Sequence, residues 1–305
     1  MKSVFGLGLR VREKLYEAGV FKTRHLKHPV ISVGNLTLGG TGKTPLTMFL
    51  AERMKARGFR PVILSRGYRR SSRGPLIVSR GGGPLVPWTE SGDEPSLMAQ
   101  RLRGMAAVVV GESRHEAGLL AERENLGDLF LLDDGFQHRA LHRNVDIVSI
   151  DPEEWHAGES LLPTGRWREP RNALNRAHAA CVQSTSNSAK LDLAIPTFQV
   201  ELKVEGFRSD GLADRSVTAF AGIAKPERFF RTLESLGIRI DQRVPFPDHH
   251  HYQAADVAKL GGDVRITTEK DAVRLVGLGD FVVLRVSATI QNFERLQQLI
   301  LDRLT

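Results

Sequence analysis

A glycine-rich segment that ends in Gly-Lys-Thr is the first place in this sequence where chemistry can be recognised. Residues 34–44 follow the apolar run Val30–Val33 and precede a helical pattern. A glycine-rich turn between a strand and a helix is typical of a phosphate-binding loop, because backbone N–H groups and the helix N-terminus attract anions. Such a loop uses its lysine for the β- and γ-phosphates and its threonine hydroxyl for Mg²⁺. The predicted nucleotide-binding residues are Gly39, Gly40, Thr41, Gly42, Lys43 and Thr44.

One position departs from the strict pattern of a phosphate-binding loop. The pattern has a glycine five places before Gly42, where this sequence has Thr37. Gly39 and Gly40 can still supply the tight turn, because glycine adopts backbone conformations that other residues avoid. A glycine-rich loop with an incidental Lys-Thr pair is the alternative that these residues leave open.

Acidic side chains at two further places could complete a phosphotransfer site. Asp133 and Asp134 follow the apolar run Leu129–Leu132, as do the carboxylates that orient Mg²⁺ beside a phosphate-binding loop. Asp-Asp-Gly is also a common turn, which is the structural alternative. Asp93 precedes the helical run Ser96–Gln100. It is either a helix cap or a general base that accepts the proton of an acceptor hydroxyl.

A run of three histidines and two basic loops are the remaining polar features. Adjacent side chains of an extended chain point in alternating directions, so residues 249–251 are poorly arranged for one metal ion. One histidine that acts on the substrate is the preferred interpretation, and a solvated loop is the alternative. Arginines near residues 66–70 and 161–170 can clamp phosphate oxygens or form a solvated basic surface. The segment Thr267–Val273 indicates a strand end that caps a helix.

Composition limits the class of protein. The 305 residues suggest two domains at about 150 residues per domain, and 41% hydrophobic residues are enough for ordinary globular cores. A single cysteine, Cys181, excludes an internal disulfide and fits a reducing compartment. The net charge of +8 suits an anionic partner: a nucleotide, an acidic membrane or nucleic acid. Scattered charges and few aromatic residues disfavour nucleic acid.

Apolar runs alternate with helical patterns along most of the chain. Continuous apolar strands between helices predict an α/β fold with a parallel sheet covered on both faces. Residues 151–175 are rich in Pro, Gly, Trp and Arg, which indicates a loop or crossover. The expected strands are 30–33, 61–65, 106–110, 129–132, 145–150, 179–183, 197–205, 217–221, 264–267 and 281–286, and the expected helices lie near 46–54, 114–124, 228–236 and 293–304.

The N-terminal segment reads as a short basic amphipathic helix. Val4, Leu7, Val11 and Leu15 recur at helical spacing among basic residues, a pattern typical of helices that lie on an anionic membrane surface. A helix packed on its own domain is the alternative. The sequence has no apolar run of about 18 residues, which spanning a bilayer requires, and no apolar core of a signal peptide.

Taken together, these segments resemble the tetraacyldisaccharide 4′-kinases, which phosphorylate a lipid A precursor. The departure at Thr37 is itself typical of that family. The match covers nearly the whole chain after about the first 20 residues, and the most specific piece is Asp-Asp-Gly-Phe-Gln-His at 133–138. The matching segments, in family order, are 33–37 with 39–44, 64–68, 92–95, 133–138, 161–163 with 168–170, 246–249 and 268–272.

The resemblance implies two α/β/α domains joined by a β-ribbon, the first of them a phosphate-loop NTPase-like parallel sheet. We expect a membrane-surface helix at 1–20, a kinase domain at 21–175 and a second α/β domain at 176–305. Residues 197–205 could belong to the ribbon. The implied reaction transfers the γ-phosphoryl group of ATP to the 4′-hydroxyl of a tetraacylated glucosamine disaccharide 1-phosphate. It would take place at the cytoplasmic face of a Gram-negative inner membrane.

The resemblance also assigns roles to individual residues. Lys43 and Thr44 match ATP and Mg²⁺ positions, and Asp93 with His249 matches a catalytic pair in which histidine supports the carboxylate. We therefore predict Asp93, His249 and Lys43 as catalytic, Thr44, Asp133, Asp134 and Glu169 as metal-binding, and Arg66, Tyr68, Gln137 and His138 as substrate-binding.

One departure from the family concerns the membrane. Many members begin with a longer apolar segment, whereas this chain has only the short basic stretch, which predicts surface association of a monomer rather than spanning. Two rival functions stay open on the residues alone. The first is a phosphate-loop kinase for a soluble small molecule. The second is a nucleotide-dependent switch or metallochaperone, for which the histidine run is the only hint.

Overall fold

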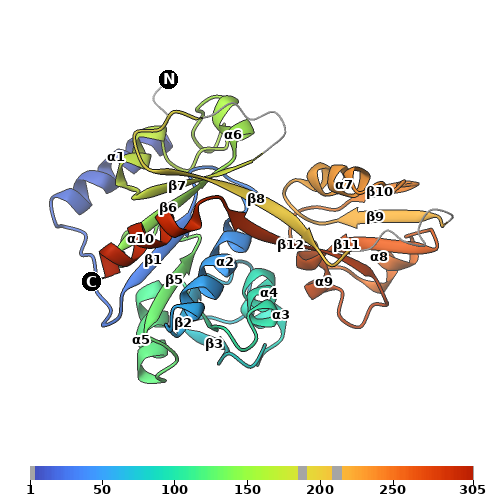
Figure 1. The fold of residues 1–305 in the computed structure, drawn as a ribbon, viewed down its shortest axis with the longest axis horizontal. Helices are drawn as coiled ribbons and strands as arrows, with labels where there is room; N and C mark the ends of the chain where they lie inside the picture. Colours follow the sequence, from blue (N-terminus) through green and yellow to red (C-terminus); the bar gives the residue numbers. More distant parts are fainter. Residues whose placement is uncertain (1–3, 185–190, 208–214, 305) are drawn as a thin grey trace.

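The structure is a computed structural model that describes residues 4–184, 191–207 and 215–304. Two lobes are visible in Figure 1, and both contain strands and helices. The first lobe contains β1 (Val30–Gly34), β2 (Pro61–Ser65), β3 (Leu76–Ser79), β4 (Ala107–Val110), β5 (Leu129–Asp133), β6 (Val145–Ile150), β7 (Ala179–Gln183), α1 (Val4–Glu17), α2 (Lys43–Ala56), α3 (Trp88–Ser91), α4 (Asp93–Arg101), α5 (Arg114–Arg123), α6 (Pro152–His156), the 3₁₀ helix η1 (Arg171–Arg176) and α10 (Phe293–Leu304). The second lobe contains β9 (Val217–Ala221), β10 (Gln242–Pro245), β11 (Val264–Thr268), α7 (Pro226–Ser235), α8 (Ala254–Ala258) and α9 (Glu269–Arg274), and β8 (Thr197–Glu205) and β12 (Val282–Ile290) connect the two lobes.

All the strands of the described residues belong to one twelve-stranded sheet in the order β10-β9-β11-β12-β8-β7-β6-β1-β5-β2-β4-β3. The pairs β8–β12 and β3–β4 are antiparallel, and the other neighbouring pairs are parallel. This arrangement confirms the expected mixed α/β fold with a large, mostly parallel sheet. Parallel strands place their carboxyl ends at a common edge, where sites in such sheets are built.

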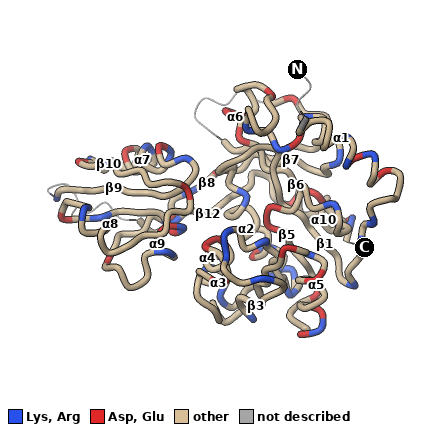
Figure 2. The backbone as a smooth tube through the Cα atoms, turned by 180° about the vertical axis from the view of Figure 1, so that it is seen from behind, with Lys and Arg blue, Asp and Glu red and all other residues tan. Residues whose placement is uncertain are grey.

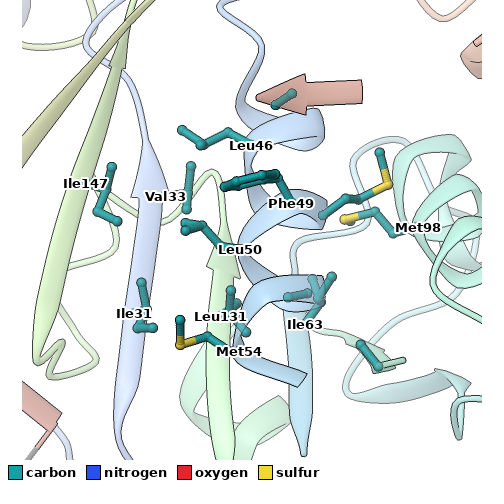
Figure 3. Close-up of a cluster of buried hydrophobic side chains, with 14 of the residues drawn as sticks. Ile31, Val33, Leu46, Phe49, Leu50, Met54, Ile63, Met98, Leu131 and Ile147 are labelled. Atoms are coloured by element: carbon teal, nitrogen blue, oxygen red, sulfur yellow. The ribbon is translucent and has the colours of Figure 1, made fainter. Parts of the chain in front are cut away.

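The core of the first lobe explains why its strands are apolar throughout. Side chains of a strand alternate between the two faces of a sheet. Ile31 and Val33 of β1 pack against α2, as Figure 3 shows, while Val30 belongs to a second cluster on the face that α5 covers. Leu46 and Leu50 lie one turn apart on α2 and are fully buried. Truncation of such a leucine to alanine typically costs about 2–5 kcal/mol.

The strands β8 and β12 form the connection between the lobes (Figure 1). They pair antiparallel from Val200↔Ile290 to Glu205↔Arg285. One end of this pair is anchored in the first lobe, because Val200 and Ile290 belong to the same buried cluster as α2. The other end leads into the second lobe, where β9 and β11 are covered by α7 on one side.

The boundary expected after residue 175 does not coincide with a change of core. β7 lies beyond it and continues the first lobe's sheet by pairing with β6. Leu296 and Ile300 of α10 are buried in the α2 cluster. The chain therefore leaves the first lobe along β8 and returns to it along β12.

Several short elements were not expected from the sequence. β3, α3, α6, β10, α8 and η1 are four to six residues long, and a segment of that length is too short to show a helical or strand period. The stretch expected as a loop at 151–175 contains two of them, α6 and η1. These two elements flank residues 166–168, which pair with residues 36–38 at the start of the phosphate-binding loop.

Candidate active site

The predicted phosphate-binding loop lies between β1 and α2 at the carboxyl edge of the sheet. Gly42 has a left-handed backbone (φ +73°) and occupies the N-cap of α2, and Gly39 has φ +111°. Inside the loop, Asn35 Nδ2 donates to Thr41 Oγ1 at 3.1 Å. Ser149 of β6 donates its hydroxyl to the Thr41 carbonyl. The loop is therefore held by its own side chains and by a neighbouring strand, with the positive end of α2 behind it.

The structure gives a reason for threonine in place of the early glycine. Thr37 is buried and forms an antiparallel bridge with Trp167. On the next residue, Leu38 N donates to the Arg166 carbonyl at 2.7 Å, and Arg166 Nη2 donates back to the Leu38 carbonyl at 2.8 Å. The first part of the loop is thus paired with residues 166–167 like a short strand, a role in which threonine is favoured over glycine.

The Asp-Asp pair lies beside this loop, as predicted. Asp133 ends β5 opposite Val33 of β1 and is only 2% exposed. Thr47 of α2 donates its hydroxyl to Asp133 Oδ1 at 3.2 Å. Burial, together with the negative charges of Glu94 and Asp134, raises the pKa of Asp133 to about 7. A positive ion near this carboxylate would relieve that unfavourable environment.

The pKa of Asp134 is shifted in the opposite direction, because cations surround this carboxylate. Lys43 Nζ lies 3.8 Å from its Oδ1, and Arg168 Nη1 donates to both of its carboxylate oxygens at 2.7 Å. Burial alone would raise the pKa of Asp134, but these two cations outweigh it and lower the pKa. Asp134 also has a left-handed backbone (φ +54°), a strained conformation that is concentrated at functional sites.

The donor set at this place fits Mg²⁺. Thr44 lies on the first turn of α2 between two residues that contact the aspartates, Lys43 and Thr47. Hydroxyl and carboxylate oxygens are the ligands that Mg²⁺ prefers. Glu169 is placed differently, because its ion pairs are with Arg12 of α1, whose Nη2 lies at 3.2 Å, and Arg176 of η1, whose Nη2 lies at 2.6 Å, whereas those of Asp134 include Lys43 of α2. Within the described part of the chain, no three His, Cys, Asp or Glu side chains form a metal-binding cluster.

Asp93 and His249 come together from the two lobes. Asp93 Oδ2 lies 2.8 Å from His249 Nδ1. Asp93 is the first residue of α4 and is 3% exposed, and its Oδ1 accepts a hydrogen bond from Glu94 N. Burial raises the pKa of Asp93, but the contact with His249 and the charges of Lys270 and Arg274 outweigh it and lower the pKa. The carboxylate is thus ionised and aligned, as a general base must be.

The backbone of His249 is strained and fixed. Its φ is +60°, which is uncommon for any residue other than glycine. Its N–H donates to the Gly222 carbonyl at 3.1 Å. The neighbouring histidines face other partners: His250 Nε2 lies 3.1 Å from Asp256, and the ring of His251 packs on Trp88. The structure therefore singles out His249, which the run of three left open.

The predicted substrate residues fall into two groups. Tyr68 and Arg66 are exposed in the loop after β2, and the ring of Tyr68 lies 5.1 Å from the ring of His249. Gln137 and His138 lie on the other side, where Gln137 Nε2 donates to the Asn35 carbonyl at 2.8 Å. Burial and the surrounding arginines, Arg114 first among them, lower the pKa of His138 to about 4. Arg70, by contrast, is held by Glu112 at 2.8 Å.

A cavity of about 670 Å³ opens between α1 and residues 159–176. Arg12 and Glu169 lie on its wall, and Glu169 Oε2 is 3.5 Å from Gln137 Nε2. The cavity therefore reaches the edge of the predicted site. Figure 2 shows basic and acidic segments interspersed over both lobes. Other side chains that line the cavity include Leu9, Arg10, Arg139, Leu161, Arg171 and Arg176.

Comparisons with known proteins identify the family of this chain. A family model described as LpxK, tetraacyldisaccharide-1-P 4′-kinase, matches residues 1–305. This chain belongs to that family. A tetraacyldisaccharide 4′-kinase of Aquifex aeolicus (strain VF5) is 38% identical over 301 residues, which cover 96% of this chain and 93% of the relative. The corresponding protein of Geobacter metallireducens is 41% identical over 292 residues, which cover 89% and 86%.

A solved structure extends the similarity to three dimensions. The crystal structure of LpxK from Aquifex aeolicus in complex with ATP superimposes with a TM-score of 0.85 at 36% identity, covering 99% of this chain and 96% of that one. The mixed α/β fold of the family is therefore shared over nearly the whole chain.

Sequence reasoning assigned no individual role to several residues of this candidate site. Arg168 binds Asp134, and Arg12 and Arg176 bind Glu169. Lys270 Nζ lies 3.3 Å from His249 Nε2, and Arg274 Nε lies 3.6 Å from Asp93 Oδ2. One signal was available for the last two: they lie four residues apart, on one face of a helix that begins in a family segment.

Proposed function

We propose that this protein transfers the γ-phosphoryl group of ATP to the 4′-hydroxyl of a tetraacyldisaccharide 1-phosphate, a reaction of lipid A biosynthesis. The observation that carries the proposal is the buried Asp93–His249 pair at 2.8 Å, combined with membership of the 4′-kinase family. A nucleotide switch needs no base for an acceptor hydroxyl, so this pair favours a kinase.

The proposed step is an in-line displacement. The 4′-oxygen forms a bond to the γ-phosphorus while the bond from that phosphorus to the β–γ bridging oxygen breaks, and ADP leaves. Asp93 accepts the hydroxyl proton, and His249 keeps the carboxylate aligned. Lys43 and the loop N–H groups stabilise the charge that spreads over the transferring group. Thr44, Asp133 and Asp134 would hold Mg²⁺, whose chemistry here is charge neutralisation on the β- and γ-phosphates.

The cavity beside α1 supports a lipid acceptor. Its lining combines arginines and three glutamates with the apolar side chains Leu9 and Leu161, and the arginines and leucines are the side chains that a phosphorylated and acylated sugar would contact. The exposed side chains of Leu7 (59%) and Val11 (50%) lie on the same helix, together with exposed Arg10 and Lys14. We propose that α1 rests on the cytoplasmic face of the inner membrane. In the described part of the chain, no helix is both long and apolar enough to cross a bilayer.

The reaction is tested by incubation of the purified protein with ATP, Mg²⁺ and the tetraacyldisaccharide 1-phosphate. Mass spectrometry should detect a bisphosphorylated product at the expense of ATP. Glucosamine and its soluble phosphates should give turnover lower by about 10²-fold or more, since they cannot occupy the acyl-binding part of the site. Equal turnover with a soluble sugar would instead support a small-molecule kinase.

Membrane association is tested by sedimentation with vesicles. The protein should bind vesicles that contain anionic lipid at low salt, and the double variant Leu7→Ser, Val11→Ser should bind less. Val276→Ser is the matched control, because Val276 is 75% exposed but lies in the second lobe. A protein that stays in the supernatant at low salt would contradict the membrane proposal.

A further inference from the structure

The ammonium group of Lys270 lies beside His249, on the side of the ring that faces away from Asp93. It is the second residue of α9, and its Nζ lies 3.1 Å from Glu94 Oε1, 3.3 Å from His249 Nε2 and 3.7 Å from Asp248 Oδ1. Its side chain is mostly buried. The ammonium group therefore contacts the one ring nitrogen of His249 that Asp93 does not.

The protonation of Lys270 is secured by its surroundings. Burial alone would lower its pKa, but the carboxylates of Glu94, Asp93 and Asp248 outweigh that effect and raise the pKa. An ammonium group has three donors and no acceptor. Its partner at 3.3 Å, His249 Nε2, must then be the unprotonated acceptor nitrogen.

We propose that Lys270 is a positioning residue that holds His249 as the neutral tautomer with its proton on Nδ1. In this tautomer Nδ1–H donates to Asp93 Oδ2, and Nε2 has no room for a second proton beside the ammonium group. The proton of the sugar hydroxyl is then directed to Asp93 and not to His249. This inference rests on the proposed function, since it deepens the roles given to Asp93 and His249.

The geometry is rigid because α9 holds both partners. Thr268 caps α9 by accepting a hydrogen bond from Asp271 N. Asp271 Oδ1 accepts from Gly222 N, and the Gly222 carbonyl accepts from His249 N. The helix that carries Lys270 is thus tied to the backbone of His249 through two hydrogen bonds at Gly222.

Other charged groups near His249 also bear on its protonation. Asp93 of α4 at 2.8 Å and Asp248 of its own loop at 3.9 Å present negative charge to the His249 ring, and Glu94 binds Lys270. Lys270 presents positive charge to the ring, and Arg274 approaches Asp93 at 3.6 Å. The loop after β2 contributes the ring of Tyr68, 5.1 Å from the His249 ring, and Arg69, which binds the Asp248 carbonyl. Lys270 is the cation in direct contact with the ring, so its removal should change the protonation of the catalytic pair more than removal of Arg274 would.

The tautomer can be measured directly in the unmodified enzyme. Nitrogen-15 NMR of the histidine-labelled protein, with the His249 signals assigned by their loss in His249→Gln, should show a protonated Nδ1 and an unprotonated Nε2 at about pH 8. A neutral ring with its proton on Nε2 at that pH would overturn the inference. The measurement needs neither lipid nor ATP, so its failure is separate from a failure of the proposed kinase activity.

Substitution of Lys270 gives a second, kinetic test. In Lys270→Met the acid limb of kcat/KM should move to higher pH by about 1–2 pH units, because the variant lacks a positive charge that disfavours proton uptake by Asp93. Lys270→Arg keeps the charge and should largely restore the acid limb. Lys259→Met changes an exposed lysine of the same lobe and should leave the profile unchanged.

These variants separate a positioning role from a merely structural one. If Lys270→Met lowers kcat but moves neither the acid limb nor the His249 nitrogen signals, the inference is wrong. Circular dichroism establishes whether the variant folds, and if it does not, the spectrum of the unmodified enzyme decides.

Discussion

The two halves of the candidate site are built in different ways. The phosphate-binding loop is local: Asn35 bonds Thr41 six residues away, and the loop lies between adjacent elements of one lobe. The catalytic pair is remote, because Asp93 and His249 are 156 positions apart and come from different lobes. The half of the site for the phosphoryl donor, which is the phosphate-binding loop, therefore depends on a short segment. The half for the acceptor hydroxyl, which is the Asp93–His249 pair, depends on how the lobes are held together.

The largest effect should come from the acceptor half. Replacement of Asp93 by asparagine removes the base but keeps the shape, and kcat should fall by about 10²–10⁴-fold. The KM for ATP should stay within about threefold, since the phosphate-binding loop is untouched. Steady-state kinetics with lipid acceptor measure both constants. Asp280→Asn, at an exposed position of the second lobe, is the control, and full turnover of Asp93→Asn would refute the assignment.

The donor half should respond differently. Lys43→Met removes the cation beside Asp134 and should lower kcat by about 10²–10³-fold. It should also weaken ATP binding, which calorimetry with ATP measures directly. Lys55→Met alters an exposed lysine of the same helix and should change neither quantity. If Lys43→Met binds ATP normally and only Asp93→Asn binds it weakly, the proposed division of the site is wrong.

The contact between the lobes should carry a moderate share of stability. Asp151 Oδ2 lies 2.7 Å from both Lys225 Nζ and Arg228 Nη2, across the lobes. Asp151→Asn keeps the side-chain cap of α6 but loses the charge, and should lower the free energy of unfolding by about 2 kcal/mol. Urea unfolding at pH 7 measures the loss. The exposed substitution Asp192→Asn should leave it within about 0.5 kcal/mol.

The same ion pairs predict a dependence on pH. Burial raises the pKa of Asp151, but Lys225 and Arg228 outweigh it and lower the pKa below its usual range. A carboxyl whose folded pKa is lowered stabilises the fold above its unfolded pKa, and this stabilisation is lost as the pH falls through the folded pKa. The difference between wild type and Asp151→Asn should be constant above about pH 5 and shrink below about pH 4. A constant difference down to about pH 3 would contradict the assignment.

The smallest effect concerns two glycines of one loop. An alanine at Gly42 would combine φ +73° with a Cβ only 2.5 Å from Gln183 Nε2. Gly42→Ala should therefore destabilise the nucleotide-free protein by about 1–2 kcal/mol. At Gly40, no heavy atom lies within 4 Å of the position that a Cβ would occupy, so Gly40→Ala should change stability by less than about 0.5 kcal/mol. Equal melting temperatures of the two variants would argue against the loop geometry.

Much of the fold could be predicted from the sequence because the sheet is covered on both faces. β2, β6, β7 and β9 begin and end at the expected residues, and so do the alternating strand β8 and the amphipathic helix α10, which show their own periods. A strand buried on both faces is apolar at every position and stands out between polar loops. The short elements could not be predicted, since contacts with the rest of the fold, and not their own periodicity, determine them.

The arrangement of the candidate site was predictable where its residues are contiguous. Gly39–Thr44 and Asp133–Asp134 form the expected surroundings of one helix N-terminus. For partners that arrive from elsewhere in the chain, the local sequence does not show which residue they contact. Arg12, which binds Glu169, is 157 positions away from it, and Lys270 is 176 positions away from Glu94. Only the fold reveals that two arginines neutralise Glu169 and that the ammonium group of Lys270 contacts the ring of His249.

The return of α10 to the first lobe has a consequence for the order of folding. Leu296 and Ile300 complete the cluster that also contains Leu46 and Leu50 behind the phosphate-binding loop. During synthesis, the loop is made early, but its supporting core stays incomplete until residues 293–304 have left the ribosome. The nucleotide-binding half, although it comes first in the sequence, is therefore the half that is finished last.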